Sequence, residues 1–177
     1  MRRVNVIGNS CAGKSRFAAR LAAVLQVPHI ELDVLDWEPG WIEASYEVFR
    51  SRVTTATAGE GWVADGNYSV ARDIVWSRID TVVWLDYAFP LVFWRALRRT
   101  LRRVSRGEQC CNGNRESLRK TFSRDSIILW VIKTHARRRR EFRGLLPGLV
   151  ANGTRVVTLR TPGTAERWLR ETELRER

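Results

Sequence analysis

The stretch that decides the fold is Gly8-Asn9-Ser10-Cys11-Ala12-Gly13-Lys14-Ser15, which matches the pattern G-x-x-x-x-G-K-[ST]. An apolar run at residues 4–7 precedes it, and apolar residues recur at helical spacing over 17–25 after it. A strand, a glycine-rich loop and a helix in this order form the context in which the pattern binds the phosphates of a nucleotide. The sequence therefore predicts a phosphate-binding loop.

Each part of this loop has a predicted task. Its backbone amides are expected to surround the β-phosphate, with the positive end of the following helix aimed at the anion. Lys14 is expected to reach the β- and γ-phosphates, and the Ser15 hydroxyl to ligate magnesium. The predicted cofactors are thus ATP and Mg²⁺. The residues predicted to bind the nucleotide here are Gly8, Asn9, Ser10, Cys11, Ala12, Gly13, Lys14, Ser15 and Arg16.

The rest of the chain alternates between apolar runs and helical patterns. Further strands are predicted over 29–32, 62–64, 81–85 and 155–159, and helices over 46–58, 93–104, 116–146 and 164–174. Ser45 is expected to cap the first of these helices, and Pro147-Gly148 to end the third. Alternating strands and helices call for a parallel sheet, because parallel neighbours need a crossover connection.

The predicted fold class is therefore α/β, a three-layer P-loop NTPase fold with a five-stranded parallel sheet and a helical lid insertion. Residues 1–177 are expected to form a single domain. Within it, we predict an acceptor-binding insertion at about 34–60 and a lid at about 101–124.

Composition limits the partners and the location. The chain has 31 basic residues and a net charge of +12, so an anionic partner is expected. Nucleic acid, nucleotide phosphates and acidic lipid all meet that condition. The longest apolar run, residues 127–132, is far shorter than the roughly 20 residues of a membrane-spanning helix. Gly8 interrupts any signal-peptide pattern, so the protein is predicted to be cytoplasmic.

Three aspartates follow predicted strands directly. Asp33, Asp65 and Asp86 come after the second, third and fourth strands. Ligands of open parallel sheets bind beyond the carboxyl ends of the strands. These carboxylates are therefore expected to lie around a bound ligand.

Several segments resemble a known group of enzymes. They are Leu32-Asp33-Val34-Leu35-Asp36-Trp37 with Pro39-Gly40-Trp41, Trp62-Val63-Ala64-Asp65-Gly66-Asn67-Tyr68, Val83-Trp84-Leu85-Asp86, and Asn112-Gly113-Asn114-Arg115-Glu116-Ser117. With the phosphate-binding loop, they resemble the nucleoside-monophosphate kinase group, which includes adenylate, shikimate and gluconate kinases. Within that group the chain is most similar to predicted kinases named DNA topology modulation or FlaR-like proteins. Cys110-Cys111 stands where that family often has an apolar pair.

The resemblance implies roles for residues at the strand ends. Asp65 would hold a magnesium-bound water, as the second residue of the metal site after Ser15. Asp33 would contact the acceptor hydroxyl, either as general base or as an orienting hydrogen-bond acceptor. Asp36 is the reserve candidate for that contact. The residues that would line the acceptor pocket with them are Trp37, Trp41, Asn67 and Tyr68.

The resemblance also implies roles for arginines and for the adenine. The family's spacing after the strand-end Asp86 falls on Arg95, which would face the adenine, and on Arg99, which would face the phosphates. Lid arginines that would close on the phosphates are Arg115, Arg119 and Arg124. Arg160 and Pro162 fall in the loop that contacts adenine. The run Arg137 to Arg140 points around a helix, so most of it is expected to face solvent.

Two classes of function meet these expectations. The first is an ATP- and Mg-dependent phosphotransferase acting on a small acceptor, such as a nucleoside, a nucleotide, a sugar or another hydroxyl or phosphate compound. The alternative is a nucleotide-dependent nucleic-acid-binding protein, in which the arginines of region 95–143 grip phosphates, or a polynucleotide-end kinase. The sequence carries no helix-turn-helix, zinc-finger or RNA-recognition signature, which favours the small-molecule kinase. The acceptor and the oligomeric state stay open.

Overall fold

The computed structural model describes residues 1–40, 42–106 and 127–176. Its main sheet has five parallel strands in the order β2-β5-β1-β6-β7. They are β1 (Arg3–Gly8), β2 (His29–Glu31), β5 (Trp62–Asp65), β6 (Thr81–Leu85) and β7 (Arg155–Leu159). The α/β class and the five-stranded parallel sheet are confirmed. Because β1 is central, the predicted phosphate-binding loop leaves the middle of the sheet.

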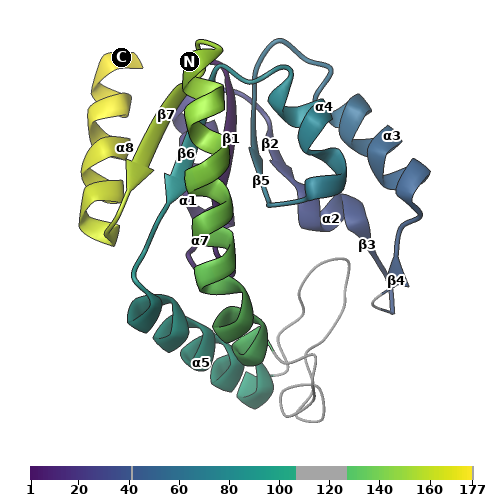
Figure 1. The fold of residues 1–177 in the computed structure, drawn as a ribbon, viewed down its shortest axis with the longest axis vertical. Helices are drawn as coiled ribbons and strands as arrows, with labels where there is room; N and C mark the ends of the chain where they lie inside the picture. The colour runs from purple at the N-terminus through teal and green to yellow at the C-terminus, as the bar shows by residue number, and fades with distance from the viewer. Residues whose placement is uncertain (41, 107–126, 177) are drawn as a thin grey trace.

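Helices cover both faces of the sheet, which makes three layers (Figure 1). α1 (Lys14–Leu25) and α8 (Pro162–Glu176) pack on one face, against Val63 and Val83 among others. α3 (Tyr46–Ala56), α4 (Arg72–Trp76) and the second half of α7 (Ile127–Ala151) pack on the other, against Ala64 and Val82. Neighbouring strand residues thus enter opposite cores, as the two-residue period of a strand requires.

The chain segment that connects β2 to β5 forms a small subassembly, and it covers the predicted acceptor-binding insertion. It comprises α2 (Leu32–Asp36), a two-stranded hairpin of β3 (Trp37–Glu38) and β4 (Ile42–Glu43), and α3. Arg52 of α3 donates hydrogen bonds to Leu35 O (3.0 Å) and Glu38 Oε1 (2.8 Å), which ties α3 to the hairpin. Ser45 caps α3 as predicted, because its Oγ accepts from the Val48 amide at 3.3 Å.

Two element boundaries differ from the sequence prediction at the N-terminal side of a helix. The strand predicted over 29–32 ends at Glu31, because Leu32 is buried as the first residue of α2. Asp33 therefore lies in the first turn of a helix and not at a strand end. α5 (Phe89–Arg106) begins four residues before the predicted start at 93. Pro90 favours that early start, because a proline in the first turn lacks only an amide that the helix leaves unpaired.

The prediction that Pro147-Gly148 ends a helix was wrong. α7 continues through Pro147 to Ala151. Phe142, Leu146 and Leu149 all pack against the same core cluster, at spacings of four and three residues. Burial of this continuous apolar stripe outweighs the single hydrogen bond that proline removes. The 3₁₀ turn η1 (Ser69–Ala71) and α4 were not predicted at all.

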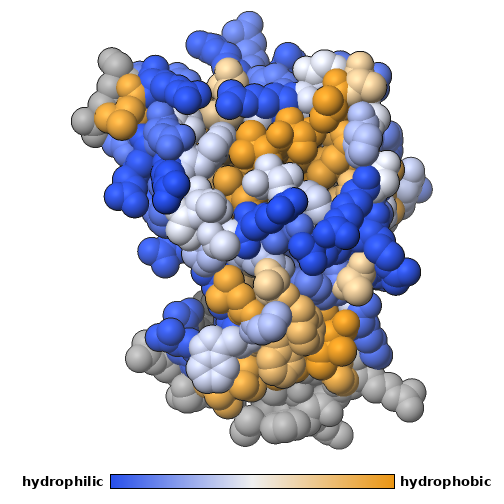
Figure 2. Space-filling model, turned by 60° about the vertical axis from the view of Figure 1, so that its left-hand side comes forward, coloured by the Kyte–Doolittle hydropathy of each residue, from blue (hydrophilic) through white to orange (hydrophobic). Residues whose placement is uncertain are grey.

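Large apolar side chains are also exposed outside these cores, on α5 and on the first turns of α7. They are Phe89, Trp94, Leu101, Leu129, Trp130 and Ile132. Figure 2 shows apolar surface in the lower part of the molecule, next to the residues drawn in grey. Over the described ranges, none of the helices combines the length and hydropathy needed to cross a bilayer.

The packing of α7 on the sheet gives a stability prediction. Phe142 is 2% exposed and its ring meets that of Trp84 edge-on, with centroids 5.9 Å apart. Phe142→Ala is expected to lower the free energy of unfolding by about 3 to 5 kcal/mol, because it leaves a cavity between α7 and β6. Urea denaturation measures this change. Leu174→Ala is the control, because Leu174 is 73% exposed, and a similar loss there would contradict the assignment of the core.

Candidate functional site

The loop between β1 and α1 has backbone torsions that favour glycine. Gly8 has φ 147°, Cys11 φ 63° and Gly13 φ 93°. A Cβ on Gly8 would lie 2.7 Å from the carbonyl oxygen of Leu85, so this position excludes side chains by contact as well as by torsion. Gly13 caps the N-terminus of α1. The loop thus has the path and the following helix that a phosphate site needs.

Lys14 lies between this loop and a group of carboxylates. Its Nζ donates a hydrogen bond to Asn9 O at 3.3 Å. Burial lowers the pKa of Lys14, and the negative charges of Asp33 and Asp65 act in the opposite direction. The ammonium group is therefore partly desolvated and close to both predicted strand-end aspartates, which suits a residue that contacts phosphate oxygens.

Ser15 and Asp65 meet across 50 residues of sequence. The Ser15 hydroxyl donates to Asp65 Oδ2 at 2.7 Å, and the Asp65 carboxylate is buried. A hydroxyl and a carboxylate are the hard oxygen donors that Mg²⁺ prefers, so this pair fits a magnesium site. His29 was not foreseen from the sequence. Its Nε2 lies 2.9 Å from Asp65 Oδ1, and this hydrogen bond raises the pKa of His29.

A second group of polar residues lies at α2, where the sequence predicts the acceptor. Tyr68 Oη donates to Asp33 Oδ1 at 2.7 Å, which brings together two residues predicted to line the acceptor pocket. Burial raises the pKa of Tyr68, and the charge of Asp33 adds to that effect. Burial also raises the pKa of Asp36 and of Glu31. Acidic groups therefore gather at this edge of the sheet, and two of them, Asp33 and Asp65, act on the charge of Lys14.

The remaining predicted acceptor residues have different outcomes. Trp37 is half-buried at the start of β3. Trp41 lies outside the described residues. Asn67 has its amide turned to the phosphate loop, where its Nδ2 donates to Gly8 O at 2.5 Å and its Oδ1 accepts from Gly8 N at 3.2 Å. The sequence analysis predicts Asn67 as a lining residue of the acceptor pocket, which stays a prediction.

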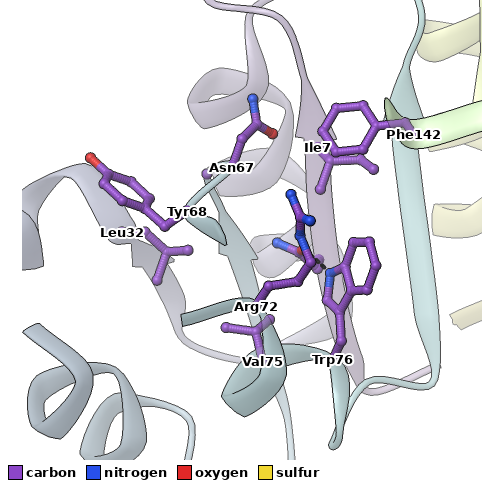
Figure 3. A pocket seen from close by; sticks show the side chains of 10 residues that line it. Ile7, Leu32, Asn67, Tyr68, Arg72, Val75, Trp76 and Phe142 are labelled. Carbon is purple, nitrogen blue, oxygen red and sulfur yellow. Dashed lines mark hydrogen bonds between the residues drawn. The ribbon is translucent and has the colours of Figure 1, made fainter. Parts of the chain in front are cut away.

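Two adjoining pockets lie between α4 and α7. The first has a volume of about 10 Å³, and Figure 3 shows the apolar side chains of Ile7, Leu32, Val75 and Phe142 around it. That space holds about one water molecule. The second has a volume of about 110 Å³. Its lining is mostly polar and consists of Asn67, Ser69, Arg72, Arg137, Arg138, Glu141 and Phe142. Only the second is large enough for part of a ligand.

The arginine run on α7 was predicted to be mostly solvent-facing, which is wrong for two of its four members. Arg139 donates to both carboxylate oxygens of buried Asp86, at 2.6 and 2.9 Å. Arg138 is half-buried beside the second pocket, with its guanidinium 5.7 Å from the ring centre of Trp130. Burial lowers the pKa of Arg138. Within the described part of the chain, it makes no hydrogen bond or ion pair.

Arg95 reaches the phosphate loop from α5. Its guanidinium donates to Ala12 O at 2.8 Å and lies 5.4 Å from the ring centre of Tyr87. Arg99, one turn later, is half-buried. Arg160 is exposed after β7, and Pro162 begins α8. The predicted lid residues Arg115, Arg119 and Arg124, and Cys110-Cys111, lie outside the described residues.

Comparisons with known proteins identify the fold. No family model matches the chain, and no curated protein matches it by sequence. A gluconokinase from Sinorhizobium meliloti 1021 matches with 17% identity and a TM-score of 0.56, over 99% of this chain and 91% of that one. A shikimate kinase from Bacteroides thetaiotaomicron matches with 15% identity and a TM-score of 0.56, over 99% of both chains. A shikimate kinase from Aquifex aeolicus matches with 16% identity and a TM-score of 0.54, over 98% and 94%.

These likenesses show that the chain has the fold of P-loop small-molecule kinases over nearly its whole length. The predicted fold class is confirmed. The finer resemblance, to the DNA topology modulation or FlaR-like proteins, stays a prediction.

The acidic group at α2 gives a prediction with a defined pH dependence. The raised pKa of Asp36 means that the folded state binds its proton more tightly than the unfolded state, so ionised Asp36 disfavours folding at neutral pH. Asp36→Asn is expected to raise the melting temperature at pH 7. The gain should shrink as pH falls through the raised pKa and vanish below about pH 4, where both states are protonated.

Asp73→Asn is the matched control with the opposite sign. Arg50 lowers the pKa of Asp73 to about 2, so ionised Asp73 favours folding at neutral pH. Thermal melts of both variants between pH 3 and 8 test the pair of expectations. A lower melting temperature for Asp36→Asn at pH 7 would contradict the assignment.

Proposed function

We propose that the protein is an ATP- and magnesium-dependent phosphotransferase that moves the γ-phosphoryl group of ATP to a small acceptor. The observation that carries the proposal is the convergence of Lys14, the Ser15–Asp65 pair and the Asp33–Tyr68 pair at one edge of the sheet. A phosphate-binding cation, a fitting magnesium site and a carboxylate next to a pocket are the parts that phosphoryl transfer needs. The fold of P-loop kinases supports it.

We assign the roles as follows from the contacts. The loop amides and Lys14 bind and orient the phosphates, and Ser15 and Asp65 would hold the metal. When bound, Mg²⁺ neutralises charge on the β- and γ-phosphate oxygens. Asp33 receives a hydrogen bond from Tyr68 through one carboxylate oxygen, Oδ1. Its second oxygen, Oδ2, is the one we assign to the acceptor, to orient its hydroxyl and take the proton.

Further nucleotide contacts are part of the same proposal. Arg95 lies against the loop at Ala12, and we assign it to the nucleotide and Arg99, on the same helix, to the phosphates. Charge developing on the transferring group is stabilised by cations already in position. Arg160 and Pro162 follow β7 at the adenine side. The lid arginines Arg115, Arg119 and Arg124 complete the proposed set.

We further propose that the acceptor carries a negatively charged group. Arg138 is half-buried beside the second pocket and makes no direct ion pair among the described residues, because the nearby Glu141 is already paired with Arg72. A partly desolvated cation is stabilised by an opposite charge, so we assign a ligand anion as the direct partner of Arg138 in this pocket. A phosphate or a carboxylate fits a guanidinium equally well.

The nucleic-acid alternative draws on the same arginines. Two of them already have intramolecular partners, because Arg95 bonds to Ala12 and Arg139 to Asp86. Exposed arginines such as Arg137, Arg140 and Arg143 keep nucleic acid, or a polynucleotide end, as an outcome of the test. Salt dependence identifies it, since binding through several phosphates weakens steeply with salt.

Turnover tests the proposed activity directly. With magnesium and ATP, the wild type is expected to release ADP well above background with at least one of a panel of nucleosides, nucleotides, sugars and short DNA or RNA. Lys14→Ala should lose at least a hundredfold of that rate, because the loop loses its phosphate-binding cation. A coupled ADP assay measures both. Background release with every small acceptor, together with stimulation by nucleic acid, would replace the proposal with the alternative.

The role of Arg138 tests whether the acceptor is negatively charged. Arg138→Met is expected to raise the KM for the acceptor about tenfold or more while the KM for ATP changes little, because it removes a charge-assisted contact on the acceptor side. Arg140→Met is the matched control, since Arg140 is exposed on the same helix. Steady-state kinetics with each substrate varied in turn separates the two constants. Equal effects of both variants would refute the assignment of Arg138.

A further inference from the structure

Asn67 occupies the boundary between the phosphate loop and the acceptor side. It lines both pockets beside α7, yet both polar ends of its amide bond to the backbone of Gly8. We propose that Asn67 is a positioning residue, which fixes Gly8, the first residue of the phosphate loop, and does not recognise the acceptor. The inference rests on the proposed function and assigns this residue a role at the same site.

The sheet register explains why the amide reaches Gly8. β1 and β5 pair in parallel from Arg3 opposite Trp62 to Val6 opposite Asp65, and the ladder closes with a long bond of 3.4 Å from Gly66 N to Val6 O. Two residues further, Gly8 stands opposite Asn67. There the side-chain amide supplies the donor and the acceptor that a neighbouring backbone would supply. Asn67 thus extends the ladder by one step after the strand has ended.

Gly66 makes it possible for the Asn67 side chain to take the place of a backbone partner. Its φ of 143° turns the chain out of β5, and a Cβ there would lie 2.9 Å from Cβ of Leu32. Such a torsion is open to glycine and strained for other residues. The turn removes the backbone of residue 67 from the ladder and leaves its side chain directed at β1, as Figure 3 shows for the upward course of Asn67 away from Tyr68.

Gly8 is therefore held from both sides. On the β6 side it pairs with Leu85, whose carbonyl oxygen leaves no room for a Cβ. On the β5 side the Asn67 amide accepts from its N–H and donates to its C=O. The amides that follow Gly8 are those that bind phosphate, and misplacement by about 1 Å can cost a hundredfold in rate. The Asn67 amide offers a separate donor and acceptor, spaced to meet the C=O and the N–H of one residue.

The test separates positioning from acceptor recognition. Asn67→Asp keeps the oxygen that accepts from Gly8 but loses the donor and sets a carboxylate against Gly8 O, and Asn67→Leu loses both bonds. Each variant is expected to weaken MgADP binding about tenfold and to lower kcat, while the KM for the acceptor stays within about twofold of the wild type. Calorimetry gives the ADP affinity and steady-state kinetics the acceptor KM.

Tyr68→Phe is the neighbouring comparison, because Tyr68 bonds to Asp33 on the acceptor side. It should show the reverse pattern, a raised acceptor KM with unchanged ADP affinity. If the Asn67 variants instead raise the acceptor KM and bind ADP normally, Asn67 is an acceptor contact and the inference fails. If both constants are unchanged in the folded fraction and only the melting temperature falls, its role is structural and the inference also fails.

The experiment also separates this inference from the proposed function. A wild type that binds ADP but phosphorylates no acceptor would refute the proposed function, while the ADP affinities still test Asn67. If the wild type binds no ADP, hydrogen exchange at the Gly8 amide decides, since the Gly8 N–H donates to Asn67 Oδ1 and this bond protects it from exchange. Exchange about tenfold faster in Asn67→Leu supports the pairing, and equal exchange overturns it.

Discussion

The absence of space around Gly8 is the constraint on which the site depends. The residue ends the central strand, and the carbonyl oxygen of Leu85 on one side and the amide of Asn67 on the other fix its position. The chain must then turn through torsions that favour glycine before α1 can begin. Because α1 starts at Lys14, the position of Gly8 also sets where the ammonium group and the Ser15 hydroxyl lie. The sheet, through one residue, therefore positions both the Lys14 ammonium group and the Ser15 hydroxyl.

The charged groups at this edge of the sheet lower the stability of the folded protein. Burial raises the pKa of Glu31 and of Asp36, and it lowers the pKa of Lys14, so each of these groups is less favourable in its charged form than in water. Sites with several such groups are where proteins accept a loss of stability in return for chemistry. A bound magnesium ion and the phosphates would supply opposite charges to the acids and to the lysine.

The sequence predicted the parts of the site that depend on local pattern. The loop, its flanking strand and helix, and the closeness of Ser15 to Asp65 follow from a motif and from the rule that parallel strands end at one edge. The five parallel strands follow from alternation of apolar runs with helical patterns. What could not be predicted depends on side-chain direction between distant segments. His29 meets Asp65 only because β2 and β5 pair, and no motif marks it.

Arg138 and Arg139 are neighbours on α7, yet their side chains have different surroundings. Successive residues on a helix point about 100° apart, so α7 can aim only one of the two at Asp86. Arg139 takes that contact with both carboxylate oxygens, and His135, one turn earlier, lies 3.0 Å from Tyr87 O through its Nε2. These contacts fix the rotation of α7 against the end of β6. That rotation turns Arg138 toward the polar pocket, so a structural ion pair at the sheet edge determines which cation faces the proposed acceptor.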